Sequence, residues 1–286
     1  MTTQTAISPA GITSGGAPLR IGSVALTVRD LDRMTRFYRD NIGLSLVETR
    51  RGLSRLGVGD DVLLELIHDP AARLVDRAEA GLFHVAFLLP DRASLGHWLR
   101  HAAQTGVRLQ GASDHLVSEA LYLADPEGNG IEIYRDRPSE DWSWAGDAVD
   151  MATIRLDLDA LAAAAPDTPW DGMPADTIIG HVHLQVGDME KADAFYEDFL
   201  GLDVTSRVRG AAFYSYGGYH HHIAANTWNS AGAGPRPTGT TGLHSIEIVT
   251  ADPALHARLA ARAKGQPSDA PTFTDPWGTV LRLRAA

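Results

Sequence analysis

Residues 37–46 read FYRDNIGLSL, and the same pattern returns at residues 195–204 as FYEDFLGLDV. A second pair of stretches follows in the same order, with LADPEGNGIEIY at residues 123–134 and FTDPWGTVLRLR at residues 273–284. Two pairs of similar stretches in the same order indicate an internal duplication, and such a repeat determines the whole fold. The chain is therefore expected to consist of two halves built on one pattern.

Each half divides again into two units of one kind. The first unit begins with IGSVALTV at 21–28, which alternates like a strand, and continues with a helical pattern that opens on Asp30 as a cap. Three short alternating runs, separated by Gly and charged residues, complete the unit as strands. We expect this βαβββ module four times, as modules one to four, at 21–68, 81–134, 179–228 and 242–284.

The domain boundaries follow from these modules. We expect a first domain at 20–135, a second domain at 179–286, and a linker at 136–178 whose Ala-rich run, prolines and acidic residues suit a surface segment. The expected fold class is α+β, with two βαβββ modules in each domain. A chain of 286 residues is long enough to give both domains a core of their own.

Composition narrows the classes of function and partner. Lys plus Arg number 25 against 36 Asp plus Glu, and the net charge of -11 disfavours nucleic acid and anionic membranes as partners. No apolar run approaches a membrane span and residues 1–20 carry no secretion signal, so we expect a cytoplasmic protein, with a homo-oligomer left open. The chain has no cysteine, which excludes disulfides, thiolate zinc sites and a cysteine nucleophile. Any bound metal must therefore use His, Asp and Glu.

Histidines and carboxylates fall in the strands of successive modules. They are His84, His181, His183 and His244 in first strands, and Glu65 and Glu132 in last strands. Residues at i and i+2 share one face of a strand, so ligands at a fixed position in each repeat can point into one cavity. Any one of these histidines is more simply a core side chain satisfied by a hydrogen bond. Their repetition at equivalent positions favours a metal site, and two His with one carboxylate suit Fe(II).

Four stretches together resemble a known superfamily, over nearly the whole chain outside the N-terminal tail and the linker. They are GLFHVAFLLP at 81–90, SDHLVSEALYLADPEGNGIEIY at 113–134, DTIIGHVHLQV at 176–186 and GGYHHHIAANTW at 217–228. They resemble the vicinal oxygen chelate superfamily of glyoxalases, bleomycin resistance proteins and extradiol dioxygenases, and within it the two-domain bacterial catechol 2,3-dioxygenases. The resemblance implies two vicinal-oxygen-chelate domains, each of two βαβββ modules, with curved mixed sheets.

The spacing typical of the superfamily selects among the candidate histidines. Its first ligand stands seven residues before the Asp that opens the helix, which selects His181, counted from Asp188, rather than His183. The same count from Asp30 reaches Ser23, so module one lacks this ligand. His183 is left as a candidate to orient the imidazole of His181.

The carboxylate ligand follows a second count. In the superfamily it stands seven residues after the Asp of the DP turn, which gives Glu132 from Asp125. The same count from Asp275 gives Arg282, and an arginine cannot ligate a metal. By this resemblance module four has lost its carboxylate.

Three pairings of modules offer different ligand sets. Modules three and four, the pair that extradiol enzymes usually place around iron, would offer His181 and His244 without a carboxylate. Modules one and two would offer Glu65, His84 and Glu132, which resembles a glyoxalase site with one ligand missing. Modules two and three offer His84, Glu132 and His181, the full set. We expect this third pairing, with modules one and four together as a degenerate support.

A His and a Tyr that face the substrate precede the DP turn in extradiol enzymes. The matching residues are His115 and Tyr122, in module two beside the expected metal. A simpler interpretation makes His115 a turn residue beside Asp114 and Tyr122 an ordinary strand aromatic. By the resemblance, His115 is a candidate to move a proton and Tyr122 to hydrogen-bond the ring oxygen.

Three adjacent histidines lie in the strand-like run YHHHIAAN at 219–226. Strand alternation would send His221 to one face and His220 and His222 to the other. The resemblance to an extradiol active-site histidine favours His221 as the inward residue and as an acid–base group. A register slip of one residue would exchange the two faces.

The resemblance implies an extradiol dioxygenase of aromatic catabolism, with Fe(II), or Mn(II) as an alternative, held by His84, Glu132 and His181. Its partners would be a small aromatic diol and O2. One alternative is a glyoxalase-like or other metal-dependent isomerase or lyase on the same fold. Another is a binding protein that sequesters a drug without catalysis, although such proteins usually lack the ligand set.

Overall fold

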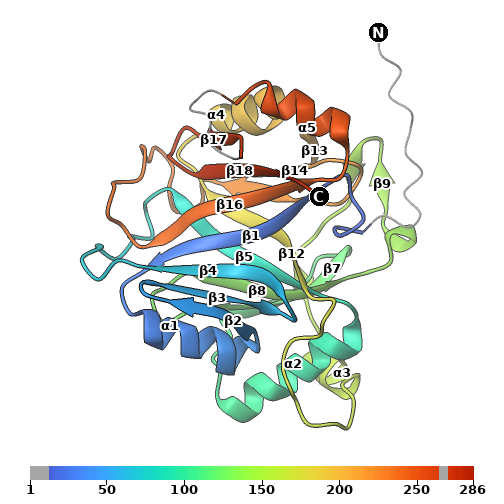
Figure 1. The fold of residues 1–286 in the computed structure, drawn as a ribbon. Coiled ribbons are helices and arrows are strands. Elements are labelled where there is room, and N and C mark those ends of the chain that lie inside the picture. Colours follow the sequence, from blue (N-terminus) through green and yellow to red (C-terminus); the bar gives the residue numbers. More distant parts are fainter. Residues whose placement is uncertain (1–12, 264–269) are drawn as a thin grey trace.

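A computed structural model describes residues 13–263 and 270–286 of the protein (Figure 1). Modules one and two each fold as strand, helix and three strands. Module one comprises β1 (Leu19–Val28), α1 (Leu31–Phe37), β2 (Ser45–Arg50), β3 (Leu53–Val58) and β4 (Asp61–His68). Module two comprises β5 (Gly81–Leu89), α2 (Arg92–Thr105), β6 (Gly111–Asp114), β7 (Ser118–Ala124) and β8 (Gly130–Asp136).

Modules three and four follow the pattern in the second half. Module three comprises β12 (Ile178–Gln185), α4 (Met189–Asp193), β13 (Asp203–Val208), β14 (Ala211–Ser215) and β15 (Ile223–Asn226). Module four comprises β16 (Gly242–Thr250), α5 (Pro253–Ala260), β17 (Thr272–Thr274) and β18 (Val280–Ala285). In module four the described residues thus give two strands after the helix rather than three. Residues 264–269 of this module lie outside the described range.

The two main sheets each combine one module from each half of the sequence. One sheet has the strand order β17-β18-β16-β1-β4-β3-β2, and the other β11-β6-β7-β8-β5-β12-β15-β14-β13. At their centres, β1 lies antiparallel to β16 and β5 lies antiparallel to β12. Helices α1, α2 and α3 lie at one side of the sheets and α4 and α5 at the other (Figure 1). The α+β class is confirmed, and modules two and three share a sheet, as the ligand count favoured.

The segment 136–178 completes the nine-stranded sheet and packs beside it. Its elements are a short 3-10 turn (Ser139–Asp141), β9 (Trp144–Ala145), β10 (Ala148–Val149), β11 (Ile154–Arg155) and α3 (Leu158–Ala163). β11 pairs with β6 at the sheet edge, and α3 packs on α2. Among the described residues, no helix has the length and apolar character needed to cross a membrane.

A buried hydrogen bond of one kind joins the two modules within each half. Tyr38, just after α1, donates its O–H to Asp125 over 2.9 Å, and Tyr196, just after α4, donates to Asp275 over 2.9 Å. Both tyrosines lie in the π-helical turns that extend these helices, and both aspartates lie in DP turns. Burial raises the pKa of Asp125 to about 6. The sheets therefore join modules across the halves, while these bonds join modules within a half.

Removal of either tyrosine hydroxyl is expected to destabilise the fold. Tyr38→Phe and Tyr196→Phe each leave a buried carboxylate without one donor, which costs about 1–3 kcal/mol in the free energy of unfolding. Urea unfolding monitored by circular dichroism measures this. Tyr216→Phe is the control, because no hydrogen bond of its hydroxyl occurs in the described part of the chain. If all three variants were as stable as the wild type, the two hydrogen bonds would have no role in stability.

Candidate functional site

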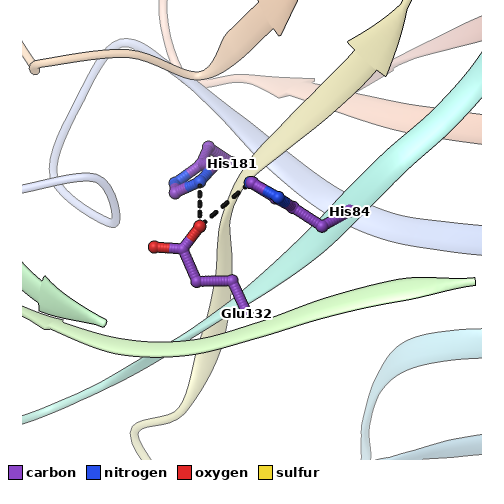
Figure 2. A group of neighbouring side chains, drawn as sticks. All are labelled: His84, Glu132 and His181. Atoms are coloured by element: carbon purple, nitrogen blue, oxygen red, sulfur yellow. Dashed lines mark hydrogen bonds and ion pairs between the residues drawn. The ribbon is translucent and has the colours of Figure 1, made fainter. Parts of the chain in front are cut away.

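Three buried side chains from neighbouring strands meet in the nine-stranded sheet (Figure 2). They are His84 of β5, Glu132 of β8 and His181 of β12, and one candidate ligand atom from each lies within 4.8 Å of the other two. The Glu132 Oε2 atom lies 2.9 Å from the His84 Nε2 atom and 3.2 Å from the His181 Nε2 atom. The structure thus brings together the two imidazoles and one carboxylate that modules two and three were expected to share.

The register of three strands produces this meeting. β5 lies between β8 and β12, and Ala86 of β5 is paired with Glu132 on one side and with His181 on the other. Directly paired residues project to the same face, and His84 lies two residues before Ala86 on that face. A β-bulge between Ile179 and His181 shifts the register of β12 next to the site, where bulges commonly re-aim a side chain.

The electrostatics of the three side chains suit metal ligation. Burial alone would raise the pKa of Glu132, but the imidazoles of His181 and His84 outweigh burial and hold that pKa well below its usual range. Burial lowers the pKa of His181 to about 4, against the opposing effect of Glu132. An anionic carboxylate beside an unprotonated imidazole is the protonation state that metal binding requires. The residues present therefore fit a divalent metal.

The three side chains form part of the wall of a cavity of about 510 Å³. Much of the remaining wall is apolar, from residues of both modules and of the segment 136–178: Phe83, Val117, Leu123, Ile131, Met151, Val208, Phe213 and Trp228. The polar wall residues include Gln110, Ser113, Ser118 and Thr153, and no Lys or Arg is among the described residues that line the cavity. The candidate metal ligands thus face a mainly apolar cavity.

His115 and Tyr122 line the same cavity and contact each other. The Tyr122 hydroxyl lies 2.7 Å from the His115 Nε2 atom, and the His115 Nδ1 atom lies 2.7 Å from the carbonyl oxygen of Ala152. A carbonyl only accepts, so His115 carries its proton on Nδ1 and accepts the Tyr122 O–H at Nε2. Burial raises the pKa of Tyr122 well above its ordinary value, so the hydroxyl keeps its proton. His115 does stand in the turn between β6 and β7, but its side chain reaches the cavity.

The three adjacent histidines do not lie in a strand. β15 begins only at Ile223, so the expectation that strand alternation orients His220, His221 and His222 is wrong. All three are buried in a loop, and His221 is the one that lines the cavity. Its ring centroid lies 4.1 Å from that of His181. The His222 Nδ1 atom instead lies 3.2 Å from the Ser215 hydroxyl.

His183 lines the cavity but does not orient His181. The side-chain amide of Asn226 donates to the His183 Nε2 atom over 3.0 Å, and no hydrogen bond between His183 and His181 occurs among the described residues. The Nδ1 atom of His181 has no hydrogen-bond partner in the part of the chain that the structure describes. Burial lowers the pKa of His183 well below its ordinary value, which makes it a neutral wall residue.

Glu65 and His244, which the two alternative ligand sets include, lie away from this site. Glu65 is in the seven-stranded sheet, where Arg55 donates to it over 2.7 Å. His244 is exposed, and its Nδ1 atom lies 3.4 Å from the Thr27 hydroxyl. The residue seven positions before Asp252 is Ser245, so His244 stands one place away from the ligand position of the other modules. In the described residues, His84, Glu132 and His181 are the one group of such side chains close enough to hold a metal.

Comparisons with known proteins agree on a family. The model of the Glyoxalase/Bleomycin resistance protein/Dioxygenase superfamily matches residues 20–133 and 178–282. Catechol-2,3-dioxygenase of Bacillus subtilis (strain 168) is 44% identical over 235 residues, which cover 80% of this chain and 82% of that protein. Biphenyl-2,3-diol 1,2-dioxygenase 3 of Rhodococcus globerulus is 27% identical over 152 residues, which cover 51% of this chain and 80% of that protein.

Solved structures show the same fold. Glyoxalase I from Zea mays superposes with a TM-score of 0.57 over 93% of this chain and 92% of that chain, at 16% sequence identity. At this level of identity the likeness concerns the arrangement of the modules and not the reaction.

Proposed function

The chain belongs to the Glyoxalase/Bleomycin resistance protein/Dioxygenase superfamily, and from that premise we propose that it is an extradiol dioxygenase acting on a catechol-type substrate. The observation that carries the proposal is the convergence of His84, Glu132 and His181 at one wall of the cavity. The two relatives named as diol dioxygenases support the same class of reaction. Glu65 lies in the other sheet, which leaves the glyoxalase-like ligand set without its second carboxylate.

The metal that we propose is Fe(II), with Mn(II) as an alternative, and His84, Glu132 and His181 would hold it. Two imidazole nitrogens and one carboxylate oxygen supply three ligands and leave further positions for exogenous ligands. When bound, the metal would supply a centre at which the diol and O2 meet and exchange electrons. The chain itself would orient the diol, exclude bulk water and move protons.

The proposed reaction balances without a further oxidant or reductant. The ring carbon–carbon bond beside one hydroxyl-bearing carbon breaks, and both atoms of O2 enter the ring-opened product. The aromatic ring supplies the electrons that reduce O2. A diol proton must leave before cleavage and a proton must return afterwards, so a neutral acceptor beside the substrate is required.

His221 meets the requirement for a proton acceptor. Burial, together with the neighbouring histidines, lowers the pKa of His221 well below its ordinary value, so its imidazole is neutral and has a free lone pair. Its ring lies against that of His181 and lines the cavity. Tyr122, held by His115, would place its hydroxyl near the substrate's oxygen atoms.

The cavity wall supports a substrate whose ring substituent is uncharged and apolar. Aromatic side chains gather at one part of the wall, where Phe83 and Trp228 pack edge to face with centroids 5.5 Å apart. With no lining Lys or Arg among the described residues, a carboxylate on the ring would be buried without a partner. Burial of an unpaired charge is strongly unfavourable.

A ring-cleavage assay with a panel of diols tests the proposed function. Protein loaded anaerobically with Fe(II) and then given O2 is expected to convert catechol and alkylcatechols to yellow products with the mass of substrate plus both oxygen atoms. For carboxylated catechols kcat/KM is expected to be at least about tenfold lower, the effect of about 1.4 kcal/mol. Absence of cleavage for every diol would refute the reaction, and a preference for carboxylated diols would refute the substrate class.

A further inference from the structure

We propose that Asp136 and His220 are positioning residues that fix the direction of a buried hydrogen-bond chain, so that His221 presents a proton-free Nε2 atom to the cavity. The inference rests on the proposed acid–base role of His221 and identifies what prepares that residue for it. Neither Asp136 nor His220 lines the cavity, and neither is a candidate metal ligand.

The chain of contacts runs from the cavity toward the surface. The His221 Nδ1 atom lies 2.7 Å from the His220 Nδ1 atom, and the His220 Nε2 atom lies 2.9 Å from the Asp136 Oδ1 atom. Tyr219 donates its O–H to the other oxygen of Asp136 over 2.9 Å. The side chain of His220 is 1% exposed and that of Asp136 is 18% exposed. Solvent can therefore reach the carboxylate but not the contact between the two imidazoles.

The carboxylate at one end of the chain sets the direction of its first hydrogen bond. A carboxylate only accepts, so the hydrogen between His220 and Asp136 belongs to the His220 Nε2 atom. We assign the hydrogen between the two imidazoles to the His221 Nδ1 atom, with the His220 Nδ1 atom as its acceptor. His221 therefore has its lone pair at Nε2. Within the described residues that atom has no hydrogen-bond partner, and the side chain lines the cavity.

Surrounding aromatic rings hold the chain in place. The ring centroid of His220 lies 4.0 Å from that of Tyr219 and 5.2 Å from that of Trp142, which belongs to the segment between the halves. The Tyr134 hydroxyl lies 2.8 Å from the Tyr219 hydroxyl, so Tyr219 has a partner on each side. A hydrogen bond that is locked in geometry and shielded from water is the usual way in which a protein selects a histidine tautomer.

Asp136→Asn is expected to reverse the chain. The asparagine oxygen can still accept from Tyr219, and its amide N–H would then donate to the His220 Nε2 atom. The proton of His220 moves to Nδ1, and His221 must accept there and carry its own proton on Nε2. A histidine in that state cannot take a proton from a diol. Tyr219→Phe is the matched control, because it removes the other donor to the same carboxylate and leaves the contact with His220.

Nitrogen-15 NMR of the imidazoles in the metal-free protein reads the tautomers directly. We expect the proton of His221 on Nδ1 in the wild type and in Tyr219→Phe, and on Nε2 in Asp136→Asn. A wild-type His221 with its proton on Nε2, or an unchanged tautomer in Asp136→Asn, would overturn the proposal. The wild-type spectrum alone can overturn it even if a variant fails to fold.

Single-turnover kinetics separate positioning from a merely structural role. In iron-loaded Asp136→Asn the ring-cleavage rate is expected to fall by about 10²–10⁴, the range for loss of a positioned proton-transfer group. Catechol affinity is expected to change much less. A loss of affinity with an unchanged rate would contradict the positioning role. If the wild type cleaves no diol, the proposed function fails, but the tautomers remain a separate result.

Discussion

Glu132→Ala is expected to abolish metal retention and turnover together. The change removes one of three candidate ligands and the single negative charge among them, at a site where both neighbouring atoms are imidazole nitrogens. Glu132→Gln is expected to behave in the same way, because it keeps the shape and removes the charge that a divalent metal requires. Elemental analysis after anaerobic loading and desalting measures retention, and the ring-cleavage assay measures turnover.

Glu65→Ala is the matched control for this prediction. Glu65 occupies the corresponding strand of module one, but Arg55 binds it in the other sheet. Its loss is expected to leave metal content and turnover unchanged. Loss of metal from the Glu65 variant, with retention in the Glu132 variants, would mean that the metal lies with a different pair of modules.

His221→Phe and His115→Phe are expected to retain iron and lose turnover. Neither residue belongs to the candidate ligand set, so metal content should match the wild type. The single-turnover rate should fall by about 10²–10⁴ if the replaced residue moves a proton. Catechol affinity should fall less, because the lost interaction matters most in the transition state.

His222→Asn is the control from the same loop. His222 is buried away from the cavity lining, and an asparagine oxygen can accept from Ser215 as the His222 Nδ1 atom does. This variant is expected to turn over at the wild-type rate. Wild-type rates in both the His115 and the His221 variant would refute their assigned roles. If a variant binds catechol weakly but converts the bound diol at the wild-type rate, the replaced histidine contributes to binding and not to catalysis.

The repeat made the fold predictable from the sequence, and the resemblance to the superfamily made the candidate ligands predictable. The spacing typical of the superfamily, counted from the Asp residues at helix starts and DP turns, selected His181 and Glu132, and His84 stands in the first strand of module two. Arg282 at the carboxylate position of module four then left modules two and three as the pair with a full set. In the structure β5 of module two and β12 of module three lie side by side, which places this full ligand set in one sheet.

Residues outside the repeat were not predictable in this way. Ala152 and Met151 lie in the segment between the halves, which has no counterpart to count from, yet they reach the cavity. The three histidines were predicted to lie in a strand because the run YHHHIAAN has a strand-like composition, but β15 begins only at Ile223. Gly217 and Gly218, with φ values of 81° and 83°, precede a loop there, and strand periodicity does not apply to it.

The central claim is that His84, Glu132 and His181, from modules two and three, hold one metal. Anomalous diffraction at the iron absorption edge from crystals of anaerobically loaded protein tests it most directly. The account predicts one strong peak bonded to the Nε2 atoms of both histidines and to a carboxylate oxygen of Glu132, at roughly 2.0–2.2 Å from each ligand atom. A peak beside Glu65 or His244, or no ordered peak at the three residues in fully loaded protein, would contradict it.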